Sequence, residues 1–434
     1  MGEDSAQGQN VQHSHTDSTA SGTNRPRTVL VASDSFKGSA SSAHVAELLE
    51  QGVHRVLPDA LVKTYSIADG GEGTVDAVVR ATGCEVRTVQ VQGPLGEPVE
   101  VQYALLAGEA DGSDASDDTP KRAQNDAPND VPNDTPKTAV LEMAQSSGIT
   151  LIEQTPENAL HADTYGVGQA ILDALDQGAT RIFVGLGGSA TSDGGMGMAR
   201  ALGVRFLDAQ GDDVPRGLAG LQTLASVDVS GLDPRVAHTE FVALTDVNNP
   251  LTGACGAVQM YGAQKGLDMS RAEEYDGWMR AYAAKVAAYG ADGAHDVSRE
   301  PGAGAAGGLG AGLLAFCSAR VLSGIDAVLD LIALDEALDG VDFVITGEGR
   351  MDAQSARGKA PVGVASRARA RGIPVVAVVG ARAEDLGEVY DEGIDLVIPL
   401  PTRPMTLAES MASVDTTLPL AAETATRAFL FGRA

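Results

Sequence analysis

Gly185-Leu-Gly-Gly-Ser-Ala-Thr-Ser-Asp-Gly-Gly195 is the stretch from which the fold and the site are predicted. It follows Arg181-Ile-Phe-Val184, a compact apolar run that is typical of a buried strand. Glycines let a backbone turn tightly and direct its N–H groups at a ligand. Together with the hydroxyls of the loop and the carboxylate of Asp193, they favour an anionic ligand held mainly by main-chain donors. A simple glycine-rich turn between a strand and a helix is the alternative.

The same stretch also matches a dinucleotide-binding fingerprint, in the form Gly185-x-Gly187-x-x-Ala190. This match keeps an NAD-dependent dehydrogenase as an alternative function. It requires a continuous helix from about Gly188, and each glycine at positions 194, 195 and 197 would cost that helix about 1 kcal/mol relative to alanine. A second partial motif, Gln354 to Ala360, lacks the first glycine and the final serine or threonine of a P-loop, which excludes a P-loop NTPase.

The composition of the 434-residue chain is that of an acidic protein of two or three domains. Its 31 basic and 59 acidic residues give a formal charge of −28, which opposes binding to nucleic acid or to an anionic membrane. No apolar run is as long as a membrane span, and the N-terminus lacks a signal-peptide pattern. Cys84, Cys255 and Cys317 are too isolated for a disulfide framework or a zinc site. A cytoplasmic protein is therefore expected.

Two further polar loops follow short apolar runs that predict buried strands. Thr28–Ser33 leads into Asp34-Ser-Phe-Lys-Gly38, and Leu61–Ile67 leads into Asp69-Gly-Gly-Glu-Gly-Thr74. Apolar residues at helical spacing follow each loop. Because ligands in open α/β sheets gather at the carboxyl ends of strands, we expect both loops to contact a ligand. A single lysine before a helix, such as Lys37, is more often part of the solvated surface.

The remaining runs predict a hairpin in the middle of the chain and parallel units at its end. Val86–Val91 and Val99–Leu106 alternate apolar and polar residues around a turn, as hairpin strands do. Residues 1–26 and 108–136 are polar and are expected to form a disordered tail and a disordered acidic insert. The last part of the chain indicates βαβ units in a parallel sheet, with strands at Val341–Thr346, Ile373–Val379 and Ile394–Pro399 and a loop at Gly347–Ser355.

A third glycine-rich stretch, Gly302–Gly312, is expected to open an apolar helix that continues through Leu322. A helix N-terminus that the backbone of a loop approaches closely is suited to binding an anion. Small residues also suit tight helix packing, so the sequence leaves both interpretations of this stretch open.

Together, the motifs form an ordered set that resembles the bacterial class I glycerate kinases. The resemblance runs from about Thr28 to the C-terminus. The tail 1–26 and the insert 108–136 depart from the family pattern, and neither carries a motif. The motifs are Asp34-Ser-Phe-Lys-Gly38, Asp69-Gly-Gly-Glu-Gly-Thr74, Gly187-Gly-Ser-Ala-Thr191, Asp193-Gly-Gly195, Asp246-x-Asn-Asn-Pro250, Gln264-Lys-Gly266, Gly302-Ala-Gly-Ala-Ala-Gly-Gly308, and Thr346-Gly-Glu-Gly349 with Asp352-x-Gln-Ser355 and Gly358-Lys359.

The resemblance implies an α/β protein of two unlike domains with the active site in the cleft between them. One domain would be a Rossmann- or flavodoxin-like parallel sheet with helices on both faces, built from residues 27–75 and 310–434. The other would be a mixed α/β domain inserted into the first, comprising residues 76–309.

The resemblance also implies an activity, which is the ATP-dependent phosphorylation of D-glycerate in the carbon metabolism of organic acids. The product 2-phospho-D-glycerate is favoured over 3-phospho-D-glycerate. ATP and Mg²⁺ are the implied cofactors and D-glycerate the substrate; nucleic acid and membrane are not expected as partners, and a homodimer is allowed. Besides the dehydrogenase, a non-catalytic sugar-acid sensor is an alternative, although the acidic and lysine candidates favour an enzyme.

The matching motifs carry the expected site residues. Asp193 is expected to take the proton of the substrate hydroxyl, with Lys37 and Asp246 also catalytic. Mg²⁺ prefers hard oxygen ligands, which Asp246, Glu348 and Asp352 can supply. The residues expected to bind substrate or phosphate are Asp34, Ser35, Asp69, Gly70, Gly71, Glu72, Gly187, Gly188, Ser189, Lys265, Gly304, Gly307, Arg350, Gln354, Ser355 and Lys359.

Overall fold

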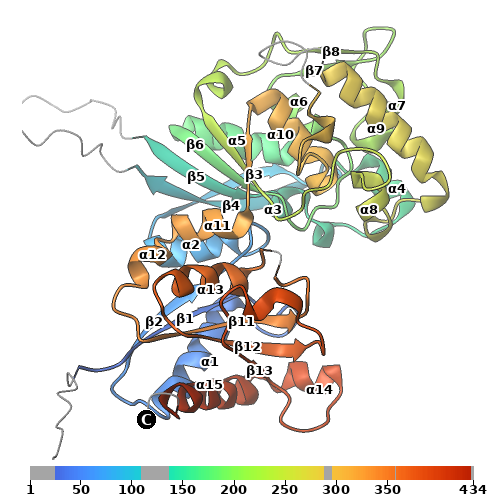
Figure 1. The fold of residues 1–434 in the computed structure, drawn as a ribbon. Coiled ribbons are helices and arrows are strands. Elements are labelled where there is room, and N and C mark those ends of the chain that lie inside the picture. The colour runs from blue at the N-terminus through green and yellow to red at the C-terminus, as the bar shows by residue number, and fades with distance from the viewer. Residues whose placement is uncertain (1–24, 109–135, 288–295, 357, 432–434) are drawn as a thin grey trace, which may run out of the picture.

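The fold is known from a computed structural model, and Figure 1 shows its helices and strands in two lobes, each built around one sheet. No helix in the described part of the chain is long and apolar enough to cross a membrane. Nearly all of the expected tail 1–26 and acidic insert 108–136 lies outside the residues that the structure describes, which are 25–108, 136–287, 296–356 and 358–431.

The first sheet is entirely parallel and joins the two ends of the chain. Its strand order is β13-β12-β11-β1-β2, so β1 lies between a C-terminal strand and an N-terminal one. Val29 is opposite Phe343 on one side and Val62 on the other. The expected parallel units at the end of the chain are therefore confirmed. The strands are β1 (Thr28–Ser33), β2 (Leu61–Ser66), β11 (Phe343–Met351), β12 (Val375–Arg382) and β13 (Leu396–Pro399).

Strand β1 is buried on both faces, which explains why its sequence is apolar without alternation. Val29 and Val31 contact the core under helices α1 and α15. Leu30 and Ala32 contact the opposite core, under α11, α12 and α13. The sheet thus has helices on both faces, as expected; they are α1 (Ser42–His54), α15 (Val414–Phe431), α11 (Gly324–Leu331), α12 (Leu334–Ala337) and α13 (Ala360–Ala370).

Strand β11 is longer than the sequence predicted. The loop expected at Gly347–Ser355 begins only after Met351, because Arg350 and Met351 still pair with Ala381 and Arg382 of β12. The apolar pattern ends at Thr346, but the main-chain pairing with the neighbouring strand continues. As a result, Glu348 lies on a strand of the sheet and is held more rigidly than a loop residue.

The second sheet is mixed, with strand order β10-β9-β6-β5-β4-β3. Strands β3 and β4 pair antiparallel with Val91 opposite Val99, which confirms the predicted hairpin. The pairs β5–β6, β6–β9 and β9–β10 are parallel. The strands are β3 (Glu85–Gln92), β4 (Pro98–Ala107), β5 (Lys137–Glu142), β6 (Ala179–Gly185), β9 (Glu240–Leu244) and β10 (Arg320–Leu322).

Helices cover the mixed sheet, and its core contains most of the large buried side chains, including Tyr103, Phe206 and Tyr282. Helix α2 (Thr74–Thr82) lies with α11 between the two lobes (Figure 1), in a core shared by both sheets. The other elements are α3 (Met143–Ser147), α4 (Pro156–His161), α5 (Tyr165–Asp176), α6 (Met196–Ala201), β7 (Arg205–Leu207), α7 (Gly217–Thr223), β8 (Ser226–Asp228), α8 (Ala257–Tyr261), α9 (Ala272–Val286), α10 (Leu309–Cys317) and, in the parallel lobe, α14 (Leu407–Ala412).

The division between the lobes differs from the expected one after residue 309. Helix α10 packs in the core of the mixed sheet, and β10 pairs with β9 of that sheet. The apolar helix expected to run through Leu322 instead ends at Cys317, because the chain must turn to enter β10. We therefore propose that the mixed α/β domain extends from the end of α2 to Leu322.

Replacing residues 109–135 with an Asn-Gly turn should leave folding and turnover intact. The ends of this segment already meet, because Ala107 pairs with Lys137 and a Cβ added to Gly108 would lie 2.0 Å from the carbonyl oxygen of Pro136. Shortening a loop changes its closure free energy by only about 0.6 kcal/mol per twofold change in length. Thermal unfolding and steady-state kinetics of the shortened protein test this, and a collapse of activity would show that the insert contacts the site.

Candidate active site

Two cavities open at the carboxyl ends of strands from both sheets. The first, which we call the glycine-loop cavity, has a volume of about 410 Å³ and is lined by residues that follow β2, β6 and β9. The second, the α14 cavity, has a volume of about 690 Å³ and is lined by residues that follow β1 and β13, by the end of β11 and by α14. Asp69 lines both cavities and therefore marks the place where they meet.

Close backbone contacts between glycines hold Asp69 at this junction. A Cβ added to Gly70 would lie 2.8 Å from the Cα of Gly324, and one added to Gly187 would lie 2.7 Å from the Cα of Gly71. Gly70 also has a φ of +82°, which side chains rarely allow. The loop after β2 is therefore wedged between the loop after β6 and the start of α11, and larger residues would force these loops apart.

Asp34 lines the α14 cavity and Asp246 lines the glycine-loop cavity, and the charge of Asp69 acts on both carboxyl groups. Burial raises the pKa of Asp34 to about 6, and the neighbouring Asp69 carboxylate adds to the effect. The same two causes, in the same order, raise the pKa of Asp246 to about 6. The Asp246 carboxylate accepts a hydrogen bond of 2.9 Å from the backbone N–H of Gly324. The junction thus gathers negative charge that a cation or a proton would relieve.

Glu348 adds a fourth carboxylate on the α14 side. Its side chain is buried, and burial raises the pKa of this carboxyl group. One oxygen, Oε2, lies 3.6 Å from the Nζ of Lys359, whereas Oε1 is buried without a hydrogen-bond partner in the described protein. The Nζ of Lys359 also donates to Ser355 Oγ at 3.4 Å. An unsatisfied buried oxygen beside a cavity is costly and indicates a missing partner.

The cations are divided unequally between the cavities. Among the described residues, Lys37, Arg350 and Lys359 line the α14 cavity, whereas Lys265 is the one lysine or arginine that lines the glycine-loop cavity. Lys265 is only 2 % exposed, and its Nζ donates to the carbonyl oxygen of Thr191 at 2.6 Å. Burial lowers the pKa of Lys265 to about 7, which the charge of Asp193 partly opposes. A bound anion would restore its full charge.

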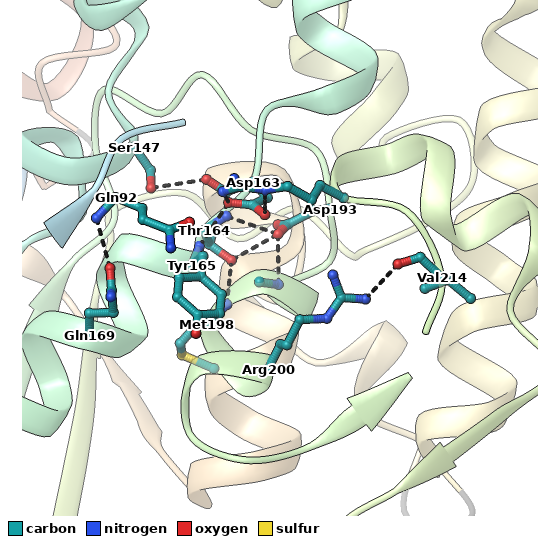
Figure 2. A network of polar contacts seen from close by, with 12 residues as sticks. Gln92, Ser147, Asp163, Thr164, Tyr165, Gln169, Asp193, Met198, Arg200 and Val214 are labelled. Atoms are coloured by element: carbon teal, nitrogen blue, oxygen red, sulfur yellow. Dashed lines mark hydrogen bonds and ion pairs between the residues drawn. The ribbon is translucent and has the colours of Figure 1, made fainter. Parts of the chain in front are cut away.

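The Asp193 side chain lies apart from both cavities. It is fully buried. Figure 2 shows its carboxylate inside a polar network with Thr164. It accepts hydrogen bonds from Thr164 N and Oγ1 at 3.0 and 2.9 Å, from Gly195 N at 3.1 Å and from Gly197 N at 2.9 Å. These bonds fix the turn from the glycine loop into α6, and we propose that Asp193 has a positioning role in place of the expected role as proton acceptor.

Several other expected binding residues also lie apart from the cavities. Gly307 approaches a backbone closely, but it is the backbone of the protein itself, because an added Cβ would lie 1.9 Å from the carbonyl oxygen of Thr191. Gly304 packs in the same way against Asn249 and Pro250. Tight packing therefore explains this stretch better than anion binding. Glu72, Gln354, Ser355 and Asp352 line neither cavity, and the first two are exposed.

The structure brings the remaining expected residues together and adds others that the sequence did not predict. Apolar side chains line much of the α14 cavity, and no motif marks them; the main ones are Phe36, Leu400, Met405, Leu407 and Met411. The expected residues that line a cavity are Asp34, Ser35, Lys37, Asp69, Gly70, Gly71, Gly187, Gly188, Ser189, Asp246, Lys265, Glu348, Arg350 and Lys359.

Comparison with known proteins identifies the family of this chain. The sequence matches the glycerate kinase family over residues 29–430. The chain belongs to the glycerate kinase family. It is 41% identical to a glycerate kinase of Halalkalibacterium halodurans, over 91% of this chain and 96% of that protein. It is 40% identical to the glycerate 2-kinase of Escherichia coli K12, over 88% of this chain and 92% of that protein.

A solved structure supports the same assignment. The crystal structure of a protein assigned as glycerate kinase 2 from Salmonella typhimurium LT2 superposes with a TM-score of 0.76 at 37% sequence identity. The match covers 94% of this chain and 100% of the Salmonella chain. The predicted family and the two-part α/β fold are thereby confirmed, and this member of the glycerate kinase family is a kinase.

The family assignment agrees with the local geometry of the fingerprint-like stretch. A dinucleotide-binding loop would require a helix from about Gly188. Instead, Gly188, Gly194 and Gly195 have positive φ angles, and α6 begins only at Met196. The glycines that looked costly for a helix are used in a turn, so the dehydrogenase alternative is wrong.

Proposed function

We propose that this member of the glycerate kinase family transfers the γ-phosphoryl group of ATP to D-glycerate and forms 2-phospho-D-glycerate in preference to 3-phospho-D-glycerate. The observation that carries the proposal is the meeting of two cavities at Asp69. A phosphoryl transfer needs two anionic substrates held end to end, with charge neutralised between them. The name of the Escherichia coli glycerate 2-kinase supports the choice of the 2-hydroxyl.

The nucleotide triphosphate is assigned to the α14 cavity. Lys37, Arg350 and Lys359 surround this cavity, and three cations suit a chain of three phosphates. The cavity volume of about 690 Å³ lies within the range of ~300–1,000 Å³ that is typical of small-molecule sites. The overall charge of −28 does not prevent binding, because charges beyond about 8 Å are screened at physiological salt.

D-Glycerate is assigned to the glycine-loop cavity, where one lysine matches its one carboxylate. The Nζ of Lys265 uses one of its three donors on Thr191, which leaves two for the ligand. The backbone N–H groups of Gly187, Gly188 and Ser189 donate to no acceptor within the described protein. They line the same cavity as Lys265, so they are available to a carboxylate.

Asp246 is the proposed proton acceptor in place of Asp193. The bond between the γ-phosphorus and the bridging oxygen of ADP breaks as the glycerate hydroxyl oxygen bonds to phosphorus, and the hydroxyl proton passes to the carboxylate. Asp246 lines the glycine-loop cavity, and its pKa of about 6 leaves it ionised but basic at neutral pH. General bases work best when their pKa lies near the working pH.

The residues present can bind a magnesium ion, but the expected ligands Asp246, Glu348 and Asp352 do not lie together. No three His, Cys, Asp or Glu side chains of the described protein form a metal cluster. Asp246 and Glu348 line different cavities, and Asp352 lines neither. Mg²⁺ in kinases is often held by one or two carboxylates and the phosphates. Asp69 and Glu348, with its unpaired Oε1, both line the α14 cavity and would hold it together with the phosphates, and bound there it would neutralise phosphate charge.

The proposed reaction is tested by incubating the purified protein with ATP, Mg²⁺ and D-glycerate and identifying the product by ³¹P NMR. The expected product signal is that of 2-phosphoglycerate, with equimolar ADP. L-Glycerate is the matched control substrate. Hydrolysis of ATP without a phosphorylated acid would contradict the proposal, and a 3-phosphoglycerate signal would correct the assigned hydroxyl.

The plot of rate against pH should be bell-shaped, with its two sides near the shifted pKa values of Asp246 and Lys265 in the glycine-loop cavity. Asp246 loses its charge as pH falls through about 6, which removes the proton acceptor. Lys265 loses its charge as pH rises through about 7, which weakens glycerate binding. We therefore expect kcat/KM for glycerate to fall on both sides of this range. A flat profile between pH 5 and 9 would contradict both assignments.

Two further parts of the proposal concern the setting of the enzyme. We propose that it acts in the cytoplasm, where ATP is available and cysteines such as Cys84, Cys255 and Cys317, which are free in the structure, stay reduced. A homodimer stays a prediction, which light scattering of the purified protein tests.

A further inference from the structure

Helix α14 carries large apolar side chains that core packing does not explain. None of its residues is buried, and Leu407, its first residue, is 75 % exposed. A capping box holds the helix start, with Thr406 and Glu409 bonded to each other's backbone N–H groups. Exposing the Leu407 side chain to water is unfavourable, and this leucine lies at the edge of a cavity.

The α14 cavity is lined by two chemically distinct sets of side chains, which we call its charged half and its apolar half. One half contains Lys37, Arg350 and Lys359 together with the carboxylates of the junction. The other half is apolar, formed by Phe36, Leu400, Met405, Leu407 and Met411. The two halves adjoin each other, because a Cβ added to Gly38, next to Lys37, would lie 2.9 Å from the Cε of Met411. A ligand that fills the cavity therefore contacts both charged and apolar side chains.

We propose that the apolar half of the α14 cavity binds the purine base of the nucleotide, with Leu407 covering one face of the ring. This inference rests on the proposed function, because it places the triphosphate on the three cations. A planar aromatic base buries its faces against aliphatic side chains and makes favourable contacts with methionine sulfur. The glycine-loop cavity, at about 410 Å³ and with one cation, suits a smaller acid. The nucleotide thus explains why α14 keeps apolar residues in solvent.

The proposal is tested by measuring equilibrium binding of ATP, inorganic tripolyphosphate and D-glycerate by titration calorimetry in the wild type and in Leu407→Gln. Tripolyphosphate carries the phosphates without a base. We expect Leu407→Gln to raise the Kd of ATP about tenfold, which corresponds to about 1.4 kcal/mol, and to leave the other two Kd values unchanged. Leu407→Met should bind ATP like the wild type, because methionine also packs against a base.

A matched control separates this effect from a general loss of surface leucine. Leu61, at the start of β2, is 57 % exposed and lines neither the α14 cavity nor the glycine-loop cavity. Leu61→Gln should leave all three dissociation constants unchanged. Thermal unfolding of each variant shows that the fold is retained, which is expected because both side chains are largely in solvent.

Three results would overturn the proposal. These are an unchanged Kd for ATP in Leu407→Gln, an equal loss of ATP and tripolyphosphate affinity, and a loss confined to glycerate, which would place the acid in this cavity. The proposed function fails separately. If Leu407→Gln weakens ATP binding but glycerate is not phosphorylated, the proposed base site is supported and the proposed reaction is contradicted. If glycerate is phosphorylated but Leu407→Gln does not change the Kd of ATP, the reaction is supported and the base site is contradicted.

Discussion

Asp69→Asn should lower kcat by about 10²–10³-fold, because it removes one of the carboxylates proposed to hold the Mg²⁺ that neutralises the charge of the phosphoryl group. Asp69 lines both cavities, so it is placed beside the phosphoryl group in transit. Its charge also contributes to the raised pKa values of Asp34 and Asp246. Steady-state kinetics in ATP and in glycerate measure the effect. Asparagine keeps the shape of the loop, and the contacts of Gly70 and Gly71 should persist.

The same substitution should not destabilise the protein. The carboxyl groups of Asp34 and Asp246 have an ordinary pKa of 3.8 and a folded-state pKa of about 6. Between these two pH values the folded state keeps protons that the unfolded state releases. The free energy of unfolding therefore falls as the pH rises through this range. Removing the Asp69 charge lowers both raised pKa values, so the melting temperature at pH 7 should stay equal or rise. Asp76→Asn, on the exposed side of α2, is the control. Wild-type kcat in Asp69→Asn would place the reaction elsewhere.

Asp193→Ala should lower the free energy of unfolding by about 3–5 kcal/mol, a large part of the total for a typical domain. The change leaves the four donors on Thr164, Gly195 and Gly197 without their acceptor inside the protein. Buried donors that lose a partner cost far more than the hydrogen bond gained. Thermal or urea unfolding with the wild type alongside measures the loss.

Asp193→Asn distinguishes the positioning role from the role of a base. One asparagine oxygen can still accept the three hydrogen bonds that reach Oδ2, so only the bond from Gly195 to Oδ1 is replaced by an unfavourable contact between two N–H groups. We expect a smaller destabilisation, of about 1–3 kcal/mol, and a kcat per folded molecule within a few-fold of the wild type. A loss of 10²–10⁴-fold, the usual contribution of a general base, would return the catalytic role to Asp193.

The strands could be predicted from the sequence where burial alone decides them. Val29–Ala32 in β1 is apolar without alternation, as expected for a strand whose sheet is covered by helices on both faces. The end of β11 could not be predicted in this way, since Glu348 and Arg350 belong to the strand through main-chain pairing with β12 rather than through apolar side chains. The position of β10 was also hidden, because a three-residue strand joins its sheet only after a long return of the chain.

The loops that reach the cavities could be predicted where a loop's position followed from the strand before it. The loops at Asp34 and Asp69 end parallel strands and do reach the cavities. The surroundings of Asp193 could not be predicted, because a sequence does not show whether a loop carboxylate turns toward a ligand or toward its own backbone N–H groups. Leu407, for which we propose a contact with the nucleotide base, was not predicted for a related reason. The leucine is isolated in the sequence, and its place in a cavity becomes visible only when the fold brings it together with the loop after β1 and the end of β11.

The pairing of β1 with β11 has a consequence for how the chain is made on the ribosome. Thr28 and Asp342 are 314 residues apart yet hydrogen-bonded. Translation at 5–20 residues per second means that β1 waits on the order of 15–60 s for its partner. Strands β3 to β10 leave the ribosome within that interval, so the mixed sheet can complete itself first. For most of its synthesis the nascent chain can therefore pair β1 with β2 but not with β11, which leaves one edge of an apolar strand open and makes the N-terminal segment a natural client for chaperones.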